Sequence, residues 1–221
     1  MSSSYAVTAS HALNAGGGGA ESLGDLSDCT TQGGTDNIGI GSGAGDSITS
    51  GGNNNICVGL NAGTAITTAD SNIIIGAYAG SDTNYNASNS VLIGYGAGQN
   101  LQYAGATANV FVGYQAGNQN DDWQNNAYFG YRTGRRIEGG NNVAIGANAL
   151  EGGQDNAGVF DSIAVGYQAL NAVTSGDDNT AIGYQAGDTI TTAANCVVIG
   201  HSADTTAGDN NQIAIGQGVS T

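Results

Sequence analysis

The sequence predicts an all-β protein, a parallel β-solenoid (β-roll) of about eleven coils of about 17 residues each. Three observations carry this prediction. A glycine-anchored unit recurs along most of the chain, apolar residues precede each anchor glycine at a spacing of two, and there are 39 glycines but no proline. Many short strands joined by turns would account for such a composition, whereas collagen would need a Gly-x-y period rich in proline.

The repeat is clearest at residues 178–187, which read Asp-Asn-Thr-Ala-Ile-Gly-Tyr-Gln-Ala-Gly. Asp, Asn or Ser usually stands four and five residues before the anchor glycine. These residue types favour a turn that leads into a strand, because their side chains bond nearby backbone amides and tolerate left-handed conformations. We expect a second short strand after the anchor, as in 64–68 and 189–192. The eleven anchors, separated by 16 to 20 residues, are Gly41, Gly59, Gly76, Gly94, Gly113, Gly130, Gly146, Gly166, Gly183, Gly200 and Gly216.

Each expected strand is mostly apolar, including the residue between the apolar pair. The pair, for example Val143 and Ile145, shares one face of its strand because side chains alternate. The central residue carries no charge in any copy, and strands that are apolar on both faces are usually buried on both. Because one coil has a single interior, we expect the central residues to form a subunit interface. They are Ile74, Leu92, Phe111, Tyr128, Ala144, Ala164, Ala181, Val198 and Ala214.

Two domains are expected. Residues 36–221 would form the solenoid, and residues 1–35 an N-terminal attachment or stalk segment with a glycine-rich linker. Residues 3–14 hold two copies of a six-residue pattern, for which a loose terminus is the alternative. We expect neither a secretion signal nor membrane insertion, because no basic segment precedes an apolar one and no apolar run could span a bilayer.

Composition argues against several functions. The net charge is −15 and only three residues are basic, which disfavours nucleic-acid binding through phosphate contacts. Three scattered cysteines and two histidines show no catalytic or metal-ligand spacing, so we expect no enzyme, no cofactor and no metal site. Asp-rich turns such as 177–178 are interpreted as solvated turns, with calcium binding as the alternative.

Two groups of residues are candidates for contact with a ligand or partner. Segment 118–140 holds Trp123, Arg132, Arg135 and Arg136, and aromatic and Arg side chains are common anchors of recognition surfaces. The alternative is an inter-subunit salt bridge with a hydrophobic plug.

The second group is Tyr114, Tyr167 and Tyr184, each of which is followed by glutamine. Such pairs could stack on sugar rings and bond to their hydroxyls. The alternative is a tyrosine ladder that seals the corner between coils.

The segments Asn-Asn-Val-Ala-Ile-Gly (141–146) and Asn-Gln-Ile-Ala-Ile-Gly (211–216) resemble the head repeats of trimeric autotransporter adhesins. The form Ala-Ile-Gly-Tyr-Gln-Ala-Gly (181–187) is similar to repeats of bacteriophage tail-fibre and other virion structural proteins. The resemblance spans residues 36–221 and implies a homotrimer.

No coiled-coil heptads or membrane anchor accompany the repeats, and this favours a virion fibre over an autotransporter. We therefore expect a non-enzymatic fibre protein that contacts host surface glycans and joins other virion proteins through its N-terminus. It would be assembled in the host cytoplasm and carried on the virion. The alternative is a purely structural capsid decoration protein or fibre subunit, or an extracellular filament subunit at the cell surface.

Overall fold

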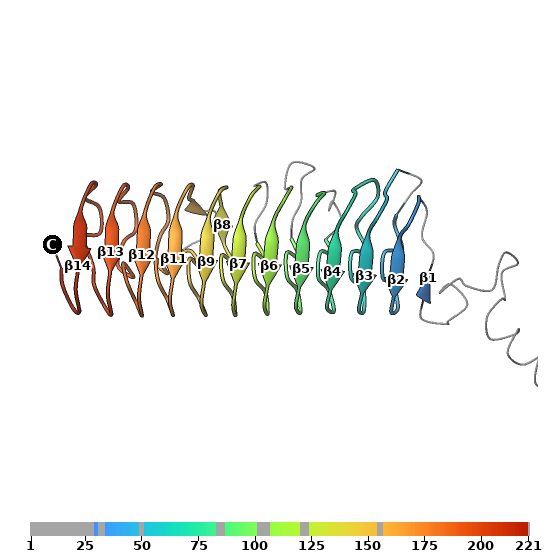
Figure 1. Cartoon of the computed structure of the whole chain (residues 1–221), viewed down its shortest axis with the longest axis horizontal. Helices are drawn as coiled ribbons and strands as arrows, with labels where there is room; N and C mark the ends of the chain where they lie inside the picture. Colours follow the sequence, from blue (N-terminus) through green and yellow to red (C-terminus); the bar gives the residue numbers. More distant parts are fainter. Residues whose placement is uncertain are drawn as a thin grey trace, which may run out of the picture.

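The computed structural model describes residues 29–30, 34–48, 51–82, 87–100, 107–119, 124–153 and 157–220. Of residues 29, 30 and 157 it describes the backbone alone. Over these ranges the chain forms a rod of stacked coils, each of which contributes one strand to a common sheet (Figure 1). The described ranges contain no helix. The expected stalk at residues 3–14 lies outside the described residues.

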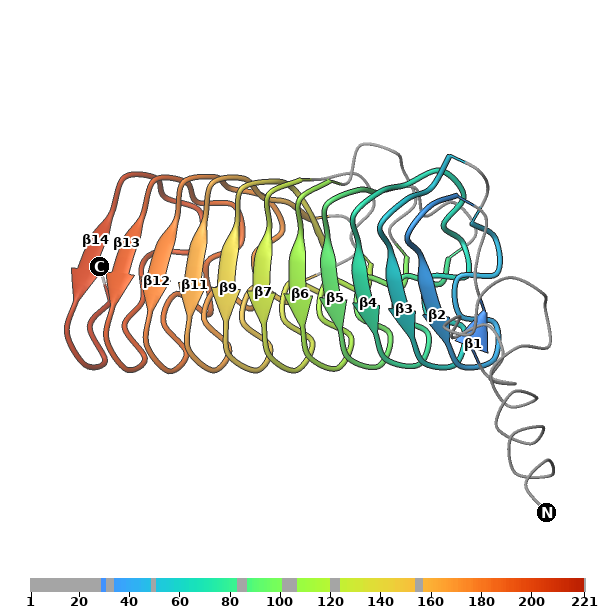
Figure 2. The same ribbon diagram turned by 45° about the vertical axis from the view of Figure 1, so that its right-hand side comes forward.

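One sheet runs the length of the rod. Its strands β2 to β7, β9 and β11 to β14 pair in parallel and in register, so each repeat position stacks on the same position of the next coil. The turned view in Figure 2 shows the strands side by side on one wall of the coil. The parallel β-solenoid predicted from the repeat is confirmed. The strands are β2 (Ile38–Ile40), β3 (Ile56–Val58), β4 (Ile73–Ile75), β5 (Val91–Ile93), β6 (Val110–Val112), β7 (Ala127–Phe129), β9 (Val143–Ile145), β11 (Ile163–Val165), β12 (Thr180–Ile182), β13 (Val197–Ile199) and β14 (Ile213–Ile215).

Three further strands stand outside this pattern. β1 (Cys29–Thr30) pairs antiparallel with β2 and covers the first edge of the sheet. β8 (Ile137–Glu138) and β10 (Ala157–Gly158) form a separate parallel pair.

The expected second strand at 64–68 and 189–192 is wrong, because both segments are turns and bends. There the backbone closes tight turns, as in the bond from Ile66 N–H to Gly63 O (3.1 Å). Gly63 N–H reaches the next coil instead, at Ala79 O (2.8 Å).

The turn that enters each strand is the one expected from the sequence. The residue five before the anchor glycine has a φ between 55° and 62° in all eleven copies, and it is Asn, Asp, Ser or, at position 108, Ala. The anchor glycines also have positive φ, from 115° to 144°. A Cβ on Gly113 would lie 2.1 Å from the carbonyl oxygen of Gly130, so close stacking of coils requires glycine here.

The residue four before the anchor forms a continuous ladder of side chains, which is buried from Asn55 to Asn179. In each of the first nine coils its side-chain oxygen accepts a hydrogen bond from the backbone N–H of the same position in the next coil. Asn142, for example, accepts from Ser162 N–H (2.9 Å), while its own N–H donates to Asn126 Oδ1 (2.9 Å) and its Nδ2 donates to Val159 O (2.7 Å). We call this column the asparagine ladder. It comprises Asn37, Asn55, Asn72, Ser90, Asn109, Asn126, Asn142, Ser162 and Asn179, and it ends on the N–H of Cys196.

The asparagine ladder decides which face of the strand points inward. Positions four and two before the anchor share a face by alternation, and the ladder is buried, so the central residue of each strand is buried in its own coil. The sequence-based assignment of the central residues to a subunit interface is therefore wrong. Corrected to the coil interior are Ile74, Leu92, Phe111, Tyr128, Ala144, Ala164, Ala181, Val198 and Ala214, all at most 1% exposed in the single chain.

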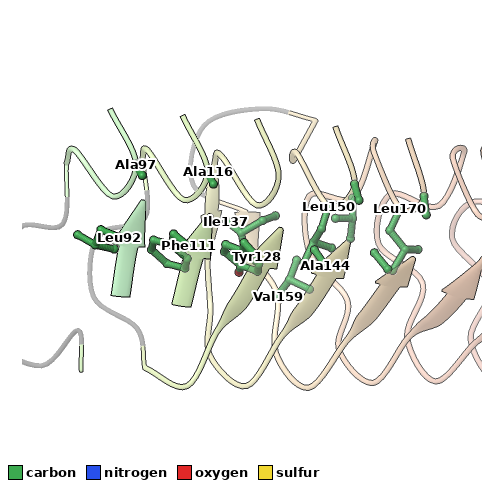
Figure 3. Close-up of a cluster of buried hydrophobic side chains, with 14 of the residues drawn as sticks. Leu92, Ala97, Phe111, Ala116, Tyr128, Ile137, Ala144, Leu150, Val159 and Leu170 are labelled. Atoms are coloured by element: carbon green, nitrogen blue, oxygen red, sulfur yellow. The ribbon is translucent and has the colours of Figure 1, made fainter. Parts of the chain in front are cut away.

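The interior side chains differ in size from coil to coil, and a large residue at one interior position is accompanied by a small one at another (Figure 3). A Cβ on Gly117 would lie 2.4 Å from the ring of Phe111, and one on Gly134 would lie 2.2 Å from the ring of Tyr128. In two coils with a central alanine, at 144 and 164, the position four after the anchor is instead a buried leucine, at 150 and 170. In the coil of Ala181 that position is Gly187, and a Cβ there would lie 3.1 Å from the side chains of both Leu170 and Ile190, which fill the space. The variable size of the central residue thus reflects packing within a coil of nearly constant cross-section.

The asparagine ladder gives a first prediction. Asn142→Ala removes the acceptor for Ser162 N–H and the donor for Val159 O, and should lower the free energy of unfolding by about 3 kcal/mol, since both groups stay buried. Asn210→Ala is the matched control, because Asn210 Oδ1 accepts the Ala194 N–H (2.8 Å) at an exposed site. Denaturant unfolding followed by circular dichroism checks both variants. An equal loss in the two would contradict the structural importance of the buried ladder.

Candidate functional site: the outer sheet face and its tyrosine edge

The face of the sheet that points away from the coil interior is uncharged along the whole rod and apolar except at Thr180. Residues three and one before each anchor point outward, and none of them is ionisable in a chain of net charge −15. We call these two columns the outer sheet face. It consists of Ile38, Ile40, Ile56, Val58, Ile73, Ile75, Val91, Ile93, Val110, Val112, Ala127, Phe129, Val143, Ile145, Ile163, Val165, Thr180, Ile182, Val197, Ile199, Ile213 and Ile215.

The outer sheet face is as extensive as the largest apolar patches found on single chains. Many of its isoleucines stay about 40% exposed, although each has a neighbour in the coils on both sides. Eleven strands spaced about 4.8 Å apart, each three residues wide, give a footprint on the order of 500 Å². The largest apolar patches of soluble monomers are of that size and are often functional.

This face is the functional feature that sequence reasoning misplaced. The strands are apolar on both faces, as expected, but the inward and outward positions are the reverse of those expected from the sequence. The Asn or Ser that stands two residues before most of the central residues is the available signal, because the two positions share a face.

Tyrosines form a stacked ladder just beyond the strands, at the residue after the anchor glycine. Tyr114 stacks between Tyr95 and Tyr131, with ring centroids 5.4 and 5.3 Å apart. Tyr184 stacks between Tyr167 and His201, at 5.3 and 4.8 Å. The ladder arrangement offered as an alternative is the one found.

The stacking limits what these rings can bind. Inside each stack the ring faces are covered by the neighbouring rings, so a sugar has no room to stack between them. The rings remain 42–47% exposed, which leaves their edges and hydroxyl groups accessible. The structure thus brings Tyr114 together with its neighbours, but separates it from Tyr167 and Tyr184 by Ala147 in the intervening coil.

Two of the three arginine side chains, those of Arg132 and Arg135, are held by contacts within the chain, and Arg136 is held through its backbone. Arg135 forms an ion pair with Glu151 (Nη1 to Oε1, 3.3 Å). Arg132 lies 5.1 Å from the ring centroid of Tyr131, and its Nε donates to Gln115 Oε1 (3.3 Å). Arg136 donates its backbone N–H to Glu151 O (3.0 Å). Trp123 lies outside the described residues.

Reactive groups are sparse in the described part of the chain. It contains no group of three or more His, Cys, Asp or Glu side chains that could hold a metal ion, and no helix long and apolar enough to cross a membrane. Burial raises the pKa of the Cys57 thiol to about 12, which leaves it an unreactive thiol. An open cavity of about 260 Å³ is lined by Ser47, Thr64, Ala65, Thr67 and Ser81, none of them an acid or base at neutral pH.

One carboxyl group has a shifted pKa. Partial burial, together with the nearby charge of Asp204, raises the pKa of Asp188 above its ordinary value, while a backbone hydrogen bond acts in the opposite direction. Asp204 itself accepts a hydrogen bond from Thr189 Oγ1 (2.5 Å). Two carboxylates alone do not complete a calcium site, which requires six or more oxygen ligands.

The raised pKa of Asp188 gives a pH-dependent prediction. The folded chain binds the Asp188 proton more tightly than the unfolded chain does. The free energy of unfolding therefore falls as pH rises from about 3.8 through the folded-state pKa of Asp188. Asp188→Asn should therefore raise the thermal midpoint slightly at pH 7 and leave it unchanged near pH 3. Melting curves across this range test the sign. A variant less stable than the parent at pH 7 would contradict it.

Comparisons of the chain with protein-family models, with curated proteins and with solved structures give no match. The function is therefore inferred from the geometry described above. That geometry combines an elongated rod, an uncharged apolar face along its length and a tyrosine edge beside that face.

Proposed function

We propose that this protein is a non-enzymatic virion fibre rod, of the tail-fibre or receptor-binding kind, that acts as a homotrimer. The observation that carries the proposal is the outer sheet face, which runs along the rod and bears no charge. A single chain leaves this face in water, whereas copies packed face against face bury it. Burial of apolar surface is the main driving force for such association.

The shape of the molecule supports a fibre. Every coil hydrogen-bonds to its neighbours through the sheet, and the asparagine ladder runs through the interior of the same coils. Such a stack is stiff along its axis and leaves no long unpaired edge on its sides. The resemblance to the repeats of virion fibres and adhesin heads points the same way.

Attachment to the rest of the particle is assigned to the N-terminal segment. Its residues 1–28 lie outside the described part of the chain, and β1 joins the segment to the first coil by pairing with β2. We assign the contact with other virion proteins to this end of the rod. Assembly takes place in the host cytoplasm, and the protein functions on the released virion.

Host surface glycans are the proposed ligands of the receptor-binding function. The hydroxyl edges of the two tyrosine stacks and the guanidinium of Arg132 offer polar groups along one side of the rod. Glycan hydroxyls could bond to these edges without entering the stacks. Tyr114, Tyr167, Tyr184 and Arg132 are the residues to test first, while Trp123, Arg135 and Arg136 complete the candidate set.

A purely structural role, as a capsid decoration protein or a fibre or filament subunit, is the second candidate. It is favoured by the way the candidate contact residues are already used. The tyrosine faces cover one another, and Arg135 is paired with Glu151 inside the chain. These contacts stabilise the rod whether or not a ligand binds.

The self-association proposal predicts a trimer in sedimentation velocity at low micromolar concentration. Ile145→Asp places a charge on the outer sheet face and should give a folded monomer, because association would bury an unpaired carboxylate. Val219→Asp is the matched control, since Val219 is an exposed apolar residue outside that face. A parent protein that sediments as a monomer would exclude the proposed assembly.

The glycan proposal predicts selective binding of the parent trimer on a glycan array. Tyr184→Ala should weaken this binding while the trimer persists in sedimentation, because Tyr184 lies beside the sheet and not on its outer face. Gln212→Ala, at a site away from the tyrosine stacks, is the control and should bind as the parent does. No binding across a broad array would favour the structural role.

A further inference from the structure

One strand of the outer sheet face differs from all the others. In β7 the two outward residues are Ala127 and Phe129. Ala127 is the smallest residue of the outer sheet face, and Phe129 is its only aromatic one. The smallest and the largest of the outward side chains therefore stand in the same coil, on opposite halves of the same strand.

Because the strands pair in register, Ala127 and Phe129 make the outer sheet face locally uneven. Ala127 lies between Val110 and Val143 of the adjacent strands, so its column is lowered at this level. Phe129 lies between Val112 and Ile145, and its ring remains 40% exposed, so its column is raised at the same level. The face thus carries a hollow and a projection side by side.

Symmetry relates the hollow of one copy to the projection of another. A cyclic assembly whose axis runs along the rod rotates each copy without shifting it along that axis, so every coil stays level with the same coil of its neighbour. The rotation also brings the first half of a strand in one copy toward the second half of the strand in the next. Ala127 of one copy then faces Phe129 of its neighbour.

We propose that Phe129 and Ala127 form a register key between neighbouring copies of this chain, in which Phe129 of one copy fills the hollow over Ala127 of the next. The inference rests on the proposed self-association and adds the orientation and alignment of the copies, which are parallel and level. The remaining columns consist almost entirely of Ile and Val. Shifting a copy by one coil would match these columns nearly as well, so they specify the alignment poorly.

The occupant of the outer sheet face is a second copy of the same chain. No residue of this face is ionisable, while the chain as a whole carries a charge of −15. Copies can therefore approach here without bringing like charges together, which they cannot do as easily elsewhere.

A swap of the two side chains tests the key. Phe129→Ala should raise the concentration at which the assembly dissociates by about tenfold or more, as truncation of a buried aromatic anchor commonly does. Ala127→Phe should weaken the assembly as well, by placing two projections against each other. The double variant Ala127→Phe/Phe129→Ala exchanges hollow and projection and should recover association toward the parent level. Additive losses in the double variant would overturn the key.

Thiol cross-linking tests the alignment directly. In a Cys29→Ser background, chains carrying Ala127→Cys are co-refolded with chains carrying Phe129→Cys and treated with a bismaleimide that spans the about 10 Å between packed sheets. The proposal predicts covalent mixed pairs, and far fewer pairs when either variant is refolded alone. Efficient cross-linking of the Phe129→Cys chain to itself would indicate antiparallel copies and overturn the proposal.

The outcomes separate the key from the assembly on which it rests. A parent protein that is monomeric by sedimentation removes both. A parent trimer that is unchanged by Phe129→Ala and gives no mixed pairs keeps the proposed fibre and removes the key alone. Circular dichroism of each variant confirms that the coil is intact, which is expected because both substitutions lie on the outer surface.

Discussion

The asparagine ladder is the interaction on which the rest of the structure depends. A side-chain oxygen at one position of each coil accepts the backbone N–H of the same position in the next, from Asn37 to Cys196. These groups are buried, and an unpaired buried amide would be costly, so each coil can pack only at the height and register that complete the bonds. The alternation of side chains along each strand then determines which residues face inward and which face outward. The central residue of each strand faces inward beside the ladder, and the apolar pair on either side faces the surroundings.

Much of the fold could be predicted from the sequence because the same unit, centred on an anchor glycine, recurs eleven times. The anchor glycines marked the coils, and the Asn, Asp and Ser residues before them marked the turns with positive φ. The orientation of the strands could not be obtained from apolar character, since Ile73, Ile74 and Ile75 are equally suited to either face. It depends on Asn72, whose burial follows from its bonds to neighbouring coils rather than from its polarity. Ordinary reasoning places an asparagine beside a turn in water, and here that reasoning fails.

The candidate site was predictable only in part, for a related reason. Tyrosine at a fixed repeat position pointed equally to a ligand surface and to a stack. The choice depended on the step from one coil to the next, which places neighbouring rings about 5.3 Å apart. The arginines raised the same ambiguity, and Glu151 decides it for Arg135 because the next coil brings their side chains together. In a solenoid, side chains one period apart are immediate neighbours, so a cluster of unusual residues in the sequence often meets partners from the adjacent coil.

The stacking of every repeat position on itself also bears on how such a rod changes in length. The strand and the turns around it keep a constant length, while the 16 to 20 residues between anchors differ only elsewhere in the coil. Loss or duplication of one whole repeat would shorten or extend the rod by about 4.8 Å and leave its cross-section and outer columns unaltered. Length is therefore a quantity that evolution can adjust one coil at a time. A change of one residue inside the segment from the turn to the anchor glycine, by contrast, would break the asparagine ladder and the sheet together.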